Sequence, residues 1–583
     1  MRILLLHLED TPLTGPWIGQ PWDLVFDLAR SGAPAYERWS RVFGCPARPV
    51  DEVRDGQAEI RKVGELLKLG LGHLVDNEGL DWWELTAILF HFQLETLVVL
   101  RKWADRLPPD AEVWITRSGF EADALRLWLG ARLHVLSSHA ARPRKGLRHY
   151  YERWRQLPAS SVLQVLKDKY DTGYRLRRHF HSRPPRNLHS VVLAPSSYVN
   201  MSRTVAAYAR QAPERRFLLV STRDSGRLDE VPDNVSQRWL ASYAGGSSLD
   251  ELRGIVERWE GLRKRLESIP ELAAMLRLEL MDDYPRRFAD GLAIRDAWIG
   301  VLDHEPVEAV LCCDDSNPAT HLPMLLGRKR GLPAISCHHG AFDGRYLIKT
   351  CHADVLLAKG EMELDYLVNT CRVDPSLLEI GAPAAPPPDN REGSSEGDWI
   401  VFFSEPYEVM AERTEEIYRD ILPGLADLAR RTGKTLKVKL HPSENLKERQ
   451  RLVATTLSGD QSRSIQWLTG NMEPELLRRM YFGVTVQSSV VVECLIHGVP
   501  CFLCEWLDLW PYGYMGQFRK FGVGMGLRSP AQIESIPDIL ARYRPDKKTT
   551  ESCRETIMPQ RLEQLLAGRR DEASVPLGRQ RAQ

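Results

Sequence analysis

Two neighbouring pieces of sequence decide the fold: KVKLHPSE at residues 437–444 and VTVQSSVVVECLIHGVPCFL at residues 484–503. The first is a short apolar run that ends in His441-Pro442, and the second predicts a strand, a Ser-Ser turn and a helix. A strand with polar residues at its carboxyl end, followed by a helix that begins with hydroxyls, is how open α/β sheets build a site for phosphate. The stretch therefore predicts a nucleotide-binding domain.

Strands and helices alternate on both sides of this stretch. The strand-like runs are SVVLAPSS (190–197), EAVLCCDDSN (308–317), LPAISCHHGAFDG (332–344), ADVLLAKG (353–360) and DWIVFFSEP (398–406). Continuous rather than alternating apolar strands, separated by helices, are typical of parallel sheets covered on both faces. The sequence predicts an α/β fold with two Rossmann-like doubly wound domains and an additional N-terminal α/β unit.

Shifts in composition indicate the domain boundaries. A stretch rich in Pro, Gly, Ser and acidic residues, APPPDNREGSSEGD at 385–398, predicts a linker between the two halves. The predicted parts are an N-terminal α/β unit (1–140), a basic helical connector (141–187), a first Rossmann-like domain (188–385) with a helical insertion (247–300), a linker (386–397), a second, nucleotide-donor domain (398–545) and a C-terminal helix with a disordered tail (546–583).

Composition excludes several classes of protein. Lys and Arg total 78, as do Asp and Glu, which argues against a nucleic-acid binder held by bulk charge. The amino terminus turns acidic after six apolar residues, so no signal peptide is expected, and no apolar stretch reaches spanning length. The ten scattered Cys indicate free thiols of a reducing cytoplasm, and Cys501 and Cys504 lack a second ligand pair for a metal.

The connector 141–187 is strongly basic, and Tyr150, Tyr151, Trp154 and Tyr170 are interleaved with its Lys and Arg residues. Such a segment can lie on anionic lipid headgroups or hold an anionic acceptor. A solvated helical connector explains the same composition equally well. Peripheral contact with an anionic membrane is therefore one of two readings of this segment.

Side chains in the stretch 437–489 suit a phosphate leaving group. Lys437, Lys439 and His441 alternate, so on a strand they share one face and concentrate positive charge at its carboxyl end. The hydroxyls and amides at Ser488 and Ser489 add donors at the favourable end of a helix dipole. Such a site can stabilise a departing phosphate without metal. The alternatives are that His441 ends a strand and that the serines only cap a helix.

The motifs quoted above, from the strand ending in His-His-Gly to the His-Pro and Ser-Ser pieces, resemble the GT-B glycosyltransferase architecture over about 190–545. Within it, the likeness is to bacterial surface-polymer enzymes: CDP-glycerol glycerophosphotransferases and the polysialyl- and Kdo-type capsule transferases. The resemblance implies that His339, before Gly340, is the catalytic base. Asp315 ranks below it, because Asp314-Asp315-Ser316 lacks the Gly that follows the acidic pair in the capsule enzymes.

The resemblance also implies the donor-binding residues. His441 would contact the donor phosphate together with Lys439, Ser488 and Ser489 would hold a donor phosphate or carboxylate, and Glu493 would bind the nucleotide ribose. The chain departs from the usual Gln-His-Gly by carrying His338, so a structural role for one of the two histidines stays open. Asp314 and Asp315 can also be strand-end residues, and Glu493 a solvated helix residue.

The expected function is transfer of a sugar or polyol phosphate from a nucleotide-activated donor to a bacterial surface glycan or glycolipid. The transfer is expected to be inverting and metal-independent, with no cofactor besides the nucleotide-sugar donor and no nucleic acid as partner. The expected location is cytoplasmic, peripheral to the inner face of the membrane. The alternatives are a sugar-nucleotide 2-epimerase of the same fold and a non-catalytic scaffold.

Overall fold

The structure is a computed structural model of the chain, and its described residues are 1–8, 10, 12–51, 56–137, 182–245, 248–340, 342–381, 397–410, 412–470, 472, 474–508 and 511–543. These residues form two compact units. One draws on 1–62, 93–142 and 386–553, and the other on 63–92 and 143–385. The predicted connector, linker and C-terminal segment lie wholly or mostly outside the described residues.

The amino-terminal sheet has five parallel strands in the order β3-β2-β1-β4-β5. Its strands are β1 (Arg2–Leu6), β2 (Leu24–Asp27), β3 (Ala47–Pro49), β4 (Glu112–Arg117) and β5 (Leu133–Ser137). The helices in this part of the chain are α1 (Ala33–Phe43), α2 (Gly56–Lys68), α3 (Trp82–Ala87), α4 (His91–Arg106) and α5 (Phe120–Leu129). Leu4 and Leu6 pack with Trp17, Trp22 and Trp39 in one core, which explains the apolar start of the chain.

The middle sheet has seven parallel strands in the order β12-β11-β10-β9-β6-β7-β8. Its strands are β6 (Val191–Ser196), β7 (Phe217–Ser221), β8 (Val235–Trp239), β9 (Val307–Cys312), β10 (Ala334–Cys337), β11 (Val355–Ala358) and β12 (Leu378–Ile380). Its helices are α9 (Val199–Gln211), α10 (Leu249–Leu266), α11 (Pro270–Arg277), α12 (Tyr284–His304), α13 (Pro318–Lys329) and α14 (Glu361–Asp365). Every residue of β6 is buried, as expected for a central strand covered on both faces.

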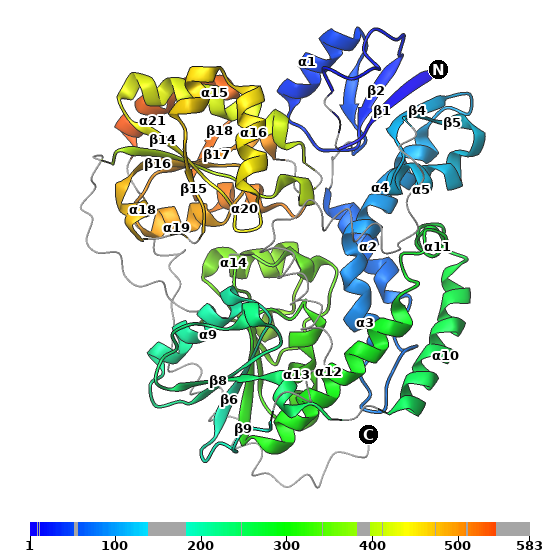
Figure 1. Ribbon diagram of the computed structural model, residues 1–583, viewed down its shortest axis with the longest axis vertical. Coiled ribbons are helices and arrows are strands. Elements are labelled where there is room, and N and C mark those ends of the chain that lie inside the picture. The colour runs from blue at the N-terminus through cyan, green and yellow to red at the C-terminus, as the bar shows by residue number, and fades with distance from the viewer. Residues whose placement is uncertain are drawn as a thin grey trace. The chain divides into compact units, whose positions relative to one another are not determined.

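The carboxyl-terminal sheet has six parallel strands in the order β15-β14-β13-β16-β17-β18. Its strands are β13 (Trp399–Phe403), β14 (Thr435–Lys439), β15 (Gln466–Leu468), β16 (Met480–Thr485), β17 (Cys501–Cys504) and β18 (Met525–Leu527). Its helices are α15 (Thr414–Thr432), α16 (Leu446–Thr456), α17 (Gly459–Ser464), α18 (Pro474–Arg479), α19 (Val490–Ile496), α20 (Tyr514–Lys520) and α21 (Ile536–Arg542). Figure 1 shows α15, α16 and α21 on one face of this sheet and α18, α19 and α20 on the other.

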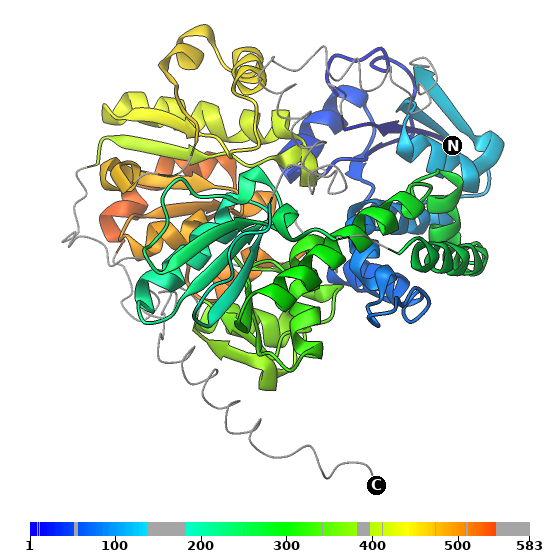
Figure 2. The ribbon, with the colours of Figure 1, turned by 60° about the horizontal axis from the view of Figure 1, so that its bottom comes forward.

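Strands of all three sheets are parallel to their neighbours, and helices separate them along the chain. The predicted fold class, two Rossmann-like doubly wound domains with an additional N-terminal α/β unit, is therefore confirmed. The predicted unit 1–140 is divided in the structure, because 63–92 groups with the middle sheet. A buried charge cluster links this segment to α10 and α12: Arg295 of α12 bonds Asp76 Oδ2 at 2.8 Å and Glu251 Oε1 of α10 at 2.6 Å. Figure 2 shows this blue helical segment beside the green helices α10 to α12.

One buried arginine ties the amino-terminal sheet to the carboxyl-terminal sheet within their common unit. Arg413 Nη2 donates to Asp27 Oδ1 at 2.5 Å and to the His7 carbonyl at 3.0 Å, and Nη1 donates to the Asp10 carbonyl at 2.7 Å. The two charged side chains are 2% and 0% exposed. Asp27 ends β2, and the carbonyls follow β1, so the guanidinium fills the carboxyl edge of the amino-terminal sheet.

The continuous helical run Trp82–Arg106 is the one helix among the described residues that is long and apolar enough to cross a membrane by length and composition, and 56% of its most apolar window is buried in the structure. No span was predicted from the sequence, because Glu, Gln and His residues interrupt the apolar residues of this run. Burial of this kind is typical of a core helix.

Candidate functional site

Two strands of the middle sheet, β6 and β9, lie side by side where the chain reverses its direction of winding. From β6 the chain adds β7 and β8 on one side, and from β9 it adds β10 to β12 on the other. In open α/β sheets ligands bind outside the carboxyl ends of such strands. Tyr198 follows β6, Asp314 follows β9, and His339 follows the next strand, β10.

These three side chains contact one another. Tyr198 Oη donates to Asp314 Oδ2 at 2.5 Å and lies 3.1 Å from His339 Nδ1. The rings of Tyr198 and His339 meet edge to face with centroids 5.1 Å apart. His339 is half-buried, and no other residue in the described part of the chain bonds its Nε2. The structure thus joins the predicted base His339 to Asp314 through a tyrosine.

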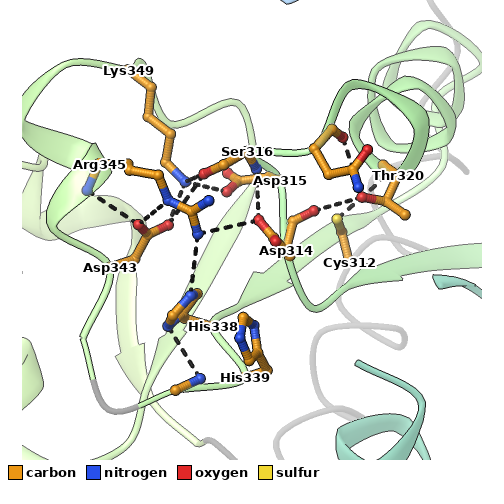
Figure 3. A network of polar contacts seen from close by, with 12 residues as sticks. Cys312, Asp314, Asp315, Ser316, Thr320, His338, His339, Asp343, Arg345 and Lys349 are labelled. Carbon is orange, nitrogen blue, oxygen red and sulfur yellow. Dashed lines mark hydrogen bonds and ion pairs between the residues drawn. The ribbon is translucent and has the colours of Figure 1, made fainter. Parts of the chain in front are cut away.

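The segment 343–349 follows this histidine pair in the sequence, and its Arg345 and Lys349 side chains contact the acidic residues after β9. Arg345 Nε donates to Asp343 Oδ1 at 2.9 Å, and Arg345 Nη2 lies 3.5 Å from Asp314 Oδ1 and 3.3 Å from His338 Nε2. Figure 3 shows the Arg345 guanidinium between these two carboxylates, with His338 beside it. Arg345 thus contacts one oxygen of the Asp314 carboxylate, and Tyr198 contacts the other.

Asp315, the second predicted catalytic residue, makes different contacts. Lys349 Nζ bonds its Oδ1 at 2.5 Å, and Tyr346 Oη donates to its Oδ2 at 2.9 Å. Lys349 also bonds Asp343 Oδ2 at 2.5 Å, so one buried ammonium joins the two aspartates (Figure 3). Both carboxylate oxygens of Asp315 are therefore occupied within the protein, whereas Asp314 is the acid that connects with His339.

Burial and charge set the protonation of the site. Burial lowers the pKa of His339 below its ordinary value, although Asp314 acts in the opposite direction. Burial would raise the pKa of Asp314, but Arg345, His338 and Lys349 together outweigh it and leave this pKa below the ordinary value. At neutral pH the pair is a neutral imidazole and a carboxylate, which is the state that a general base requires.

The carboxyl-terminal sheet has its own reversal of winding, between β13 and β16. Glu405 follows β13, and its Oε1 accepts from Thr485 Oγ1 at 3.1 Å and from the Gln487 amide at 3.3 Å. Burial raises the pKa of Glu405 to about 7. Ser488 comes next: its Oγ accepts from the Val490 amide at 3.4 Å. The Glu405 carboxyl group therefore hydrogen-bonds part of the turn that was expected to bind phosphate.

The other predicted donor residues lie around the same sheet edge. His441 is exposed, and its Nδ1 accepts from the Ser443 amide at 3.2 Å, which places the proton on Nε2. Lys439 is buried and donates to the carbonyls of Leu440 at 2.9 Å and Gly470 at 2.7 Å. Burial lowers its pKa, while the carboxylates of Glu444 and Glu493 raise it.

The remaining two residues are on α19. Ser489 is its N-cap and makes no side-chain capping hydrogen bond, and Glu493 lies exposed in its first turn. As expected from the sequence, the carboxyl-terminal sheet and α19 together hold His441, Ser488, Ser489 and Glu493. The ammonium of Lys439, however, donates to backbone carbonyls. The roles of these residues toward a donor stay predictions.

A second buried acid, Glu412, lies near Glu405 and predicts a pH-dependent stability. Burial raises its pKa to about 8, and Gln487 Nε2 donates to its Oε1 at 3.1 Å. Between pH 4.5 and 8 the unfolded chain loses this proton and the folded protein keeps it. The free energy of unfolding is therefore expected to fall with rising pH in this window, by up to about 1.4 kcal/mol per pH unit.

Urea unfolding followed by tryptophan fluorescence at pH 5.5 and pH 8 measures this slope, and Glu412→Gln should flatten it. The exposed Glu534→Gln is the matched control and should leave the slope unchanged. An unchanged slope in Glu412→Gln would contradict the assignment.

Among the described residues, no group of three or more His, Cys, Asp or Glu side chains is arranged to hold a metal ion. The polar groups of both sheet edges are hydrogen-bond donors and carboxylates, which suit a substrate with hydroxyl and phosphate groups.

Sequence reasoning missed Tyr198, Arg345 and Glu405. Tyr198 and Glu405 each lie two positions after a buried strand, in LAPSSY and FFSE. Polar residues directly after a buried strand were the available signal; it was applied to His441, whereas His339 and Asp315 came from the resemblance. Arg345 carries no such signal, because its role depends on the turn after β10.

No protein-family model and no curated protein sequence matches the chain. Solved structures do. The UDP-GlcNAc 2-epimerase from Methanocaldococcus jannaschii shows 11% identity and a TM-score of 0.41 over 65% of this chain and all of that one. Acinetobacter baumannii MurG shows 13% identity and a TM-score of 0.37 over 66% of this chain and 100% of that chain. The calicheamicin glycosyltransferase CalG4 shows 12% identity and a TM-score of 0.35 over 68% and 99%.

Proposed function

We propose that the protein is a metal-independent glycosyltransferase that moves a sugar or polyol phosphate from a nucleotide-activated donor to a hydroxyl acceptor. The observation that carries the proposal is His339 at the reversal point of the middle sheet, neutral at pH 7 and with an unengaged Nε2. A base of this kind removes the acceptor proton as the new bond forms. For sugar transfer, one base and direct displacement give inversion at the anomeric carbon, whereas for polyol phosphate transfer the displacement takes place at phosphorus.

Donor binding is assigned to the carboxyl-terminal sheet. The Nε2–H of His441 and the hydroxyls of Ser488 and Ser489 are donors that a pyrophosphate can accept from. Glu493, exposed in the first turn of α19, is the proposed acceptor of hydrogen bonds from the ribose hydroxyls. A bacterial surface glycan or glycolipid is the proposed acceptor, reached from the cytoplasmic side of the membrane with the basic segment 141–187 as the contact.

The test is incubation of the full-length protein with CMP-, CDP-, UDP- and GDP-activated donors, with and without glycan acceptors. Nucleotide release that requires an acceptor supports the transferase. Conversion of the free sugar nucleotide without acceptor would instead support a 2-epimerase. The absence of both turnover and nucleotide binding would contradict the proposal and favour the non-catalytic scaffold.

Substitution on the donor side should affect donor binding more than chemistry. In His441→Ala and Ser488→Ala, we expect the KM for the donor to rise about 10-fold each, because a charge-free donor to phosphate contributes about 1–1.5 kcal/mol. Initial-rate kinetics with the active donor measures this.

Ser443→Ala serves as the control for His441. It removes a neighbour of the ring, whose Oγ lies 2.7 Å from His441 Nδ1, and keeps the Nε2–H. An unchanged KM in both His441→Ala and Ser488→Ala would show that the donor binds elsewhere.

A further inference from the structure

The contact between Tyr198 and His339 has a direction that the neighbouring carboxylate decides. Asp314 is a carboxylate at neutral pH, so its oxygens only accept hydrogen bonds. The 2.5 Å contact from Tyr198 Oη to Asp314 Oδ2 therefore uses the single phenolic proton. Toward His339, 3.1 Å away, Tyr198 Oη can only accept.

An imidazole that donates from Nδ1 carries its proton there. Neutral His339 then has its lone pair on Nε2, the nitrogen that no residue bonds in the described part of the chain. Burial and the Asp314 charge raise the pKa of Tyr198 far above its ordinary value, so the phenol keeps its proton and the direction does not reverse with pH. Arg345, near Asp314 Oδ1, keeps this acid ionised.

The histidine before it offers a contrast. The Gly340 amide donates to His338 Nδ1 at 3.2 Å. Arg345 Nη2, which can only donate, lies 3.3 Å from His338 Nε2. Both ring nitrogens of His338 therefore face donors, so its contacts select no single neutral tautomer, whereas those of His339 select the Nδ1–H form.

We propose that Tyr198 and Asp314 are positioning residues that hold His339 in the Nδ1–H tautomer, so that Nε2 is the atom that removes the acceptor proton. The role of His339 as a base rests on the proposed function, whereas the assignment of its tautomer does not. Its components come from three strands, β6, β9 and β10, at the point where the sheet reverses its winding. After transfer the proton sits on Nε2, and the imidazolium is stabilised by the Asp314 charge relayed through the phenol.

The direct test is nitrogen NMR of the full-length protein with ¹⁵N-labelled histidine, with the His339 signals assigned by their loss in His339→Gln. We expect the wild type at pH 7.5 to show Nδ1 protonated and Nε2 unprotonated. In Tyr198→Phe, the signals should move toward the Nε2–H form. A wild-type His339 that already carries its proton on Nε2 overturns the inference, whether or not any variant folds.

Kinetics gives the second measurement. With an active donor and acceptor, Tyr198→Phe should lower kcat on the order of 10- to 100-fold and leave the donor KM unchanged, since only the orientation of the base is lost. Tyr208→Phe is the matched control: it removes a hydroxyl in the same domain that donates to the Gly381 carbonyl at 2.9 Å. It should keep kcat and the His339 tautomer. An equal loss in both tyrosine variants overturns the inference.

The two readouts separate the two proposals. If no donor and acceptor give turnover, the transferase function fails while the NMR result still decides the tautomer. If turnover is present and Tyr198→Phe changes neither kcat nor the nitrogen signals, the tautomer inference fails while the transferase stands.

Discussion

Replacing His339 by Gln should lower kcat by about 10²- to 10⁴-fold while the KM for the donor stays within a factor of about two, because general-base catalysis accounts for this range. Gln keeps the size and hydrogen-bonding ends of the side chain but cannot take a proton. Steady-state kinetics on the donor and acceptor found in the panel measures the effect. The pH profile of kcat/KM in the wild type should fall on the acidic side at a pKa below the usual 6.5 of histidine, because burial lowers the pKa of His339.

Two controls accompany this variant. His189→Gln changes an exposed histidine of the same domain and should leave kcat unchanged. His338→Gln tests the neighbour whose ring centroid lies 4.3 Å from that of His339, and its loss should be the smaller one. A larger loss in His338→Gln would move the base to that residue.

Replacing Arg413 by Met should destabilise the protein by about 3–5 kcal/mol, since it leaves Asp27, 0% exposed, as a buried and unpaired charge. The three main-chain carbonyls that Arg413 bonds also lose their donor. For domains of this size the thermal midpoint should fall by roughly 10 °C. Differential scanning calorimetry measures the shift.

The matched control is Arg101→Met, which breaks the solvent-exposed pair with Asp105 at 2.9 Å and should change the midpoint little. Combining Arg413→Met with Asp27→Asn removes the uncompensated charge and should recover part of the loss. If Arg413→Met alone melts like Arg101→Met, the ion pair contributes nothing and the two sheets are held by other contacts.

Sequence patterns predicted the central strands because these are continuous apolar runs. β6, β9, β13 and β16 are almost wholly buried, and their four-to-six-residue runs stand out against the helices. The edge strands β8 and β18 gave no such signal. In β8, VSQRW, only Val235 is buried, and β18 consists of Met525, Gly526 and Leu527 inside a glycine-rich stretch.

The candidate site was predictable only in part for a related reason. His339 and Asp314 could be proposed from strand ends, but their connection depends on Tyr198, which is 116 positions from one and 141 from the other. Local pattern carries no information on such pairs; the order of strands in the sheet brings them together. The choice between Asp314 and Asp315 likewise needed the positions of Arg345 and Lys349.

Asp27 and Arg413 are 386 positions apart in the sequence, so the ribosome makes Asp27 long before its partner. At ordinary elongation rates of 5–20 residues per second, the carboxylate waits on the order of 20–80 s for its guanidinium. During that interval Asp27, at the edge of the first sheet, has no guanidinium to neutralise it. Nascent chains of this protein should therefore depend on holding chaperones at least until Arg413, which 170 residues follow in the chain, has left the ribosome.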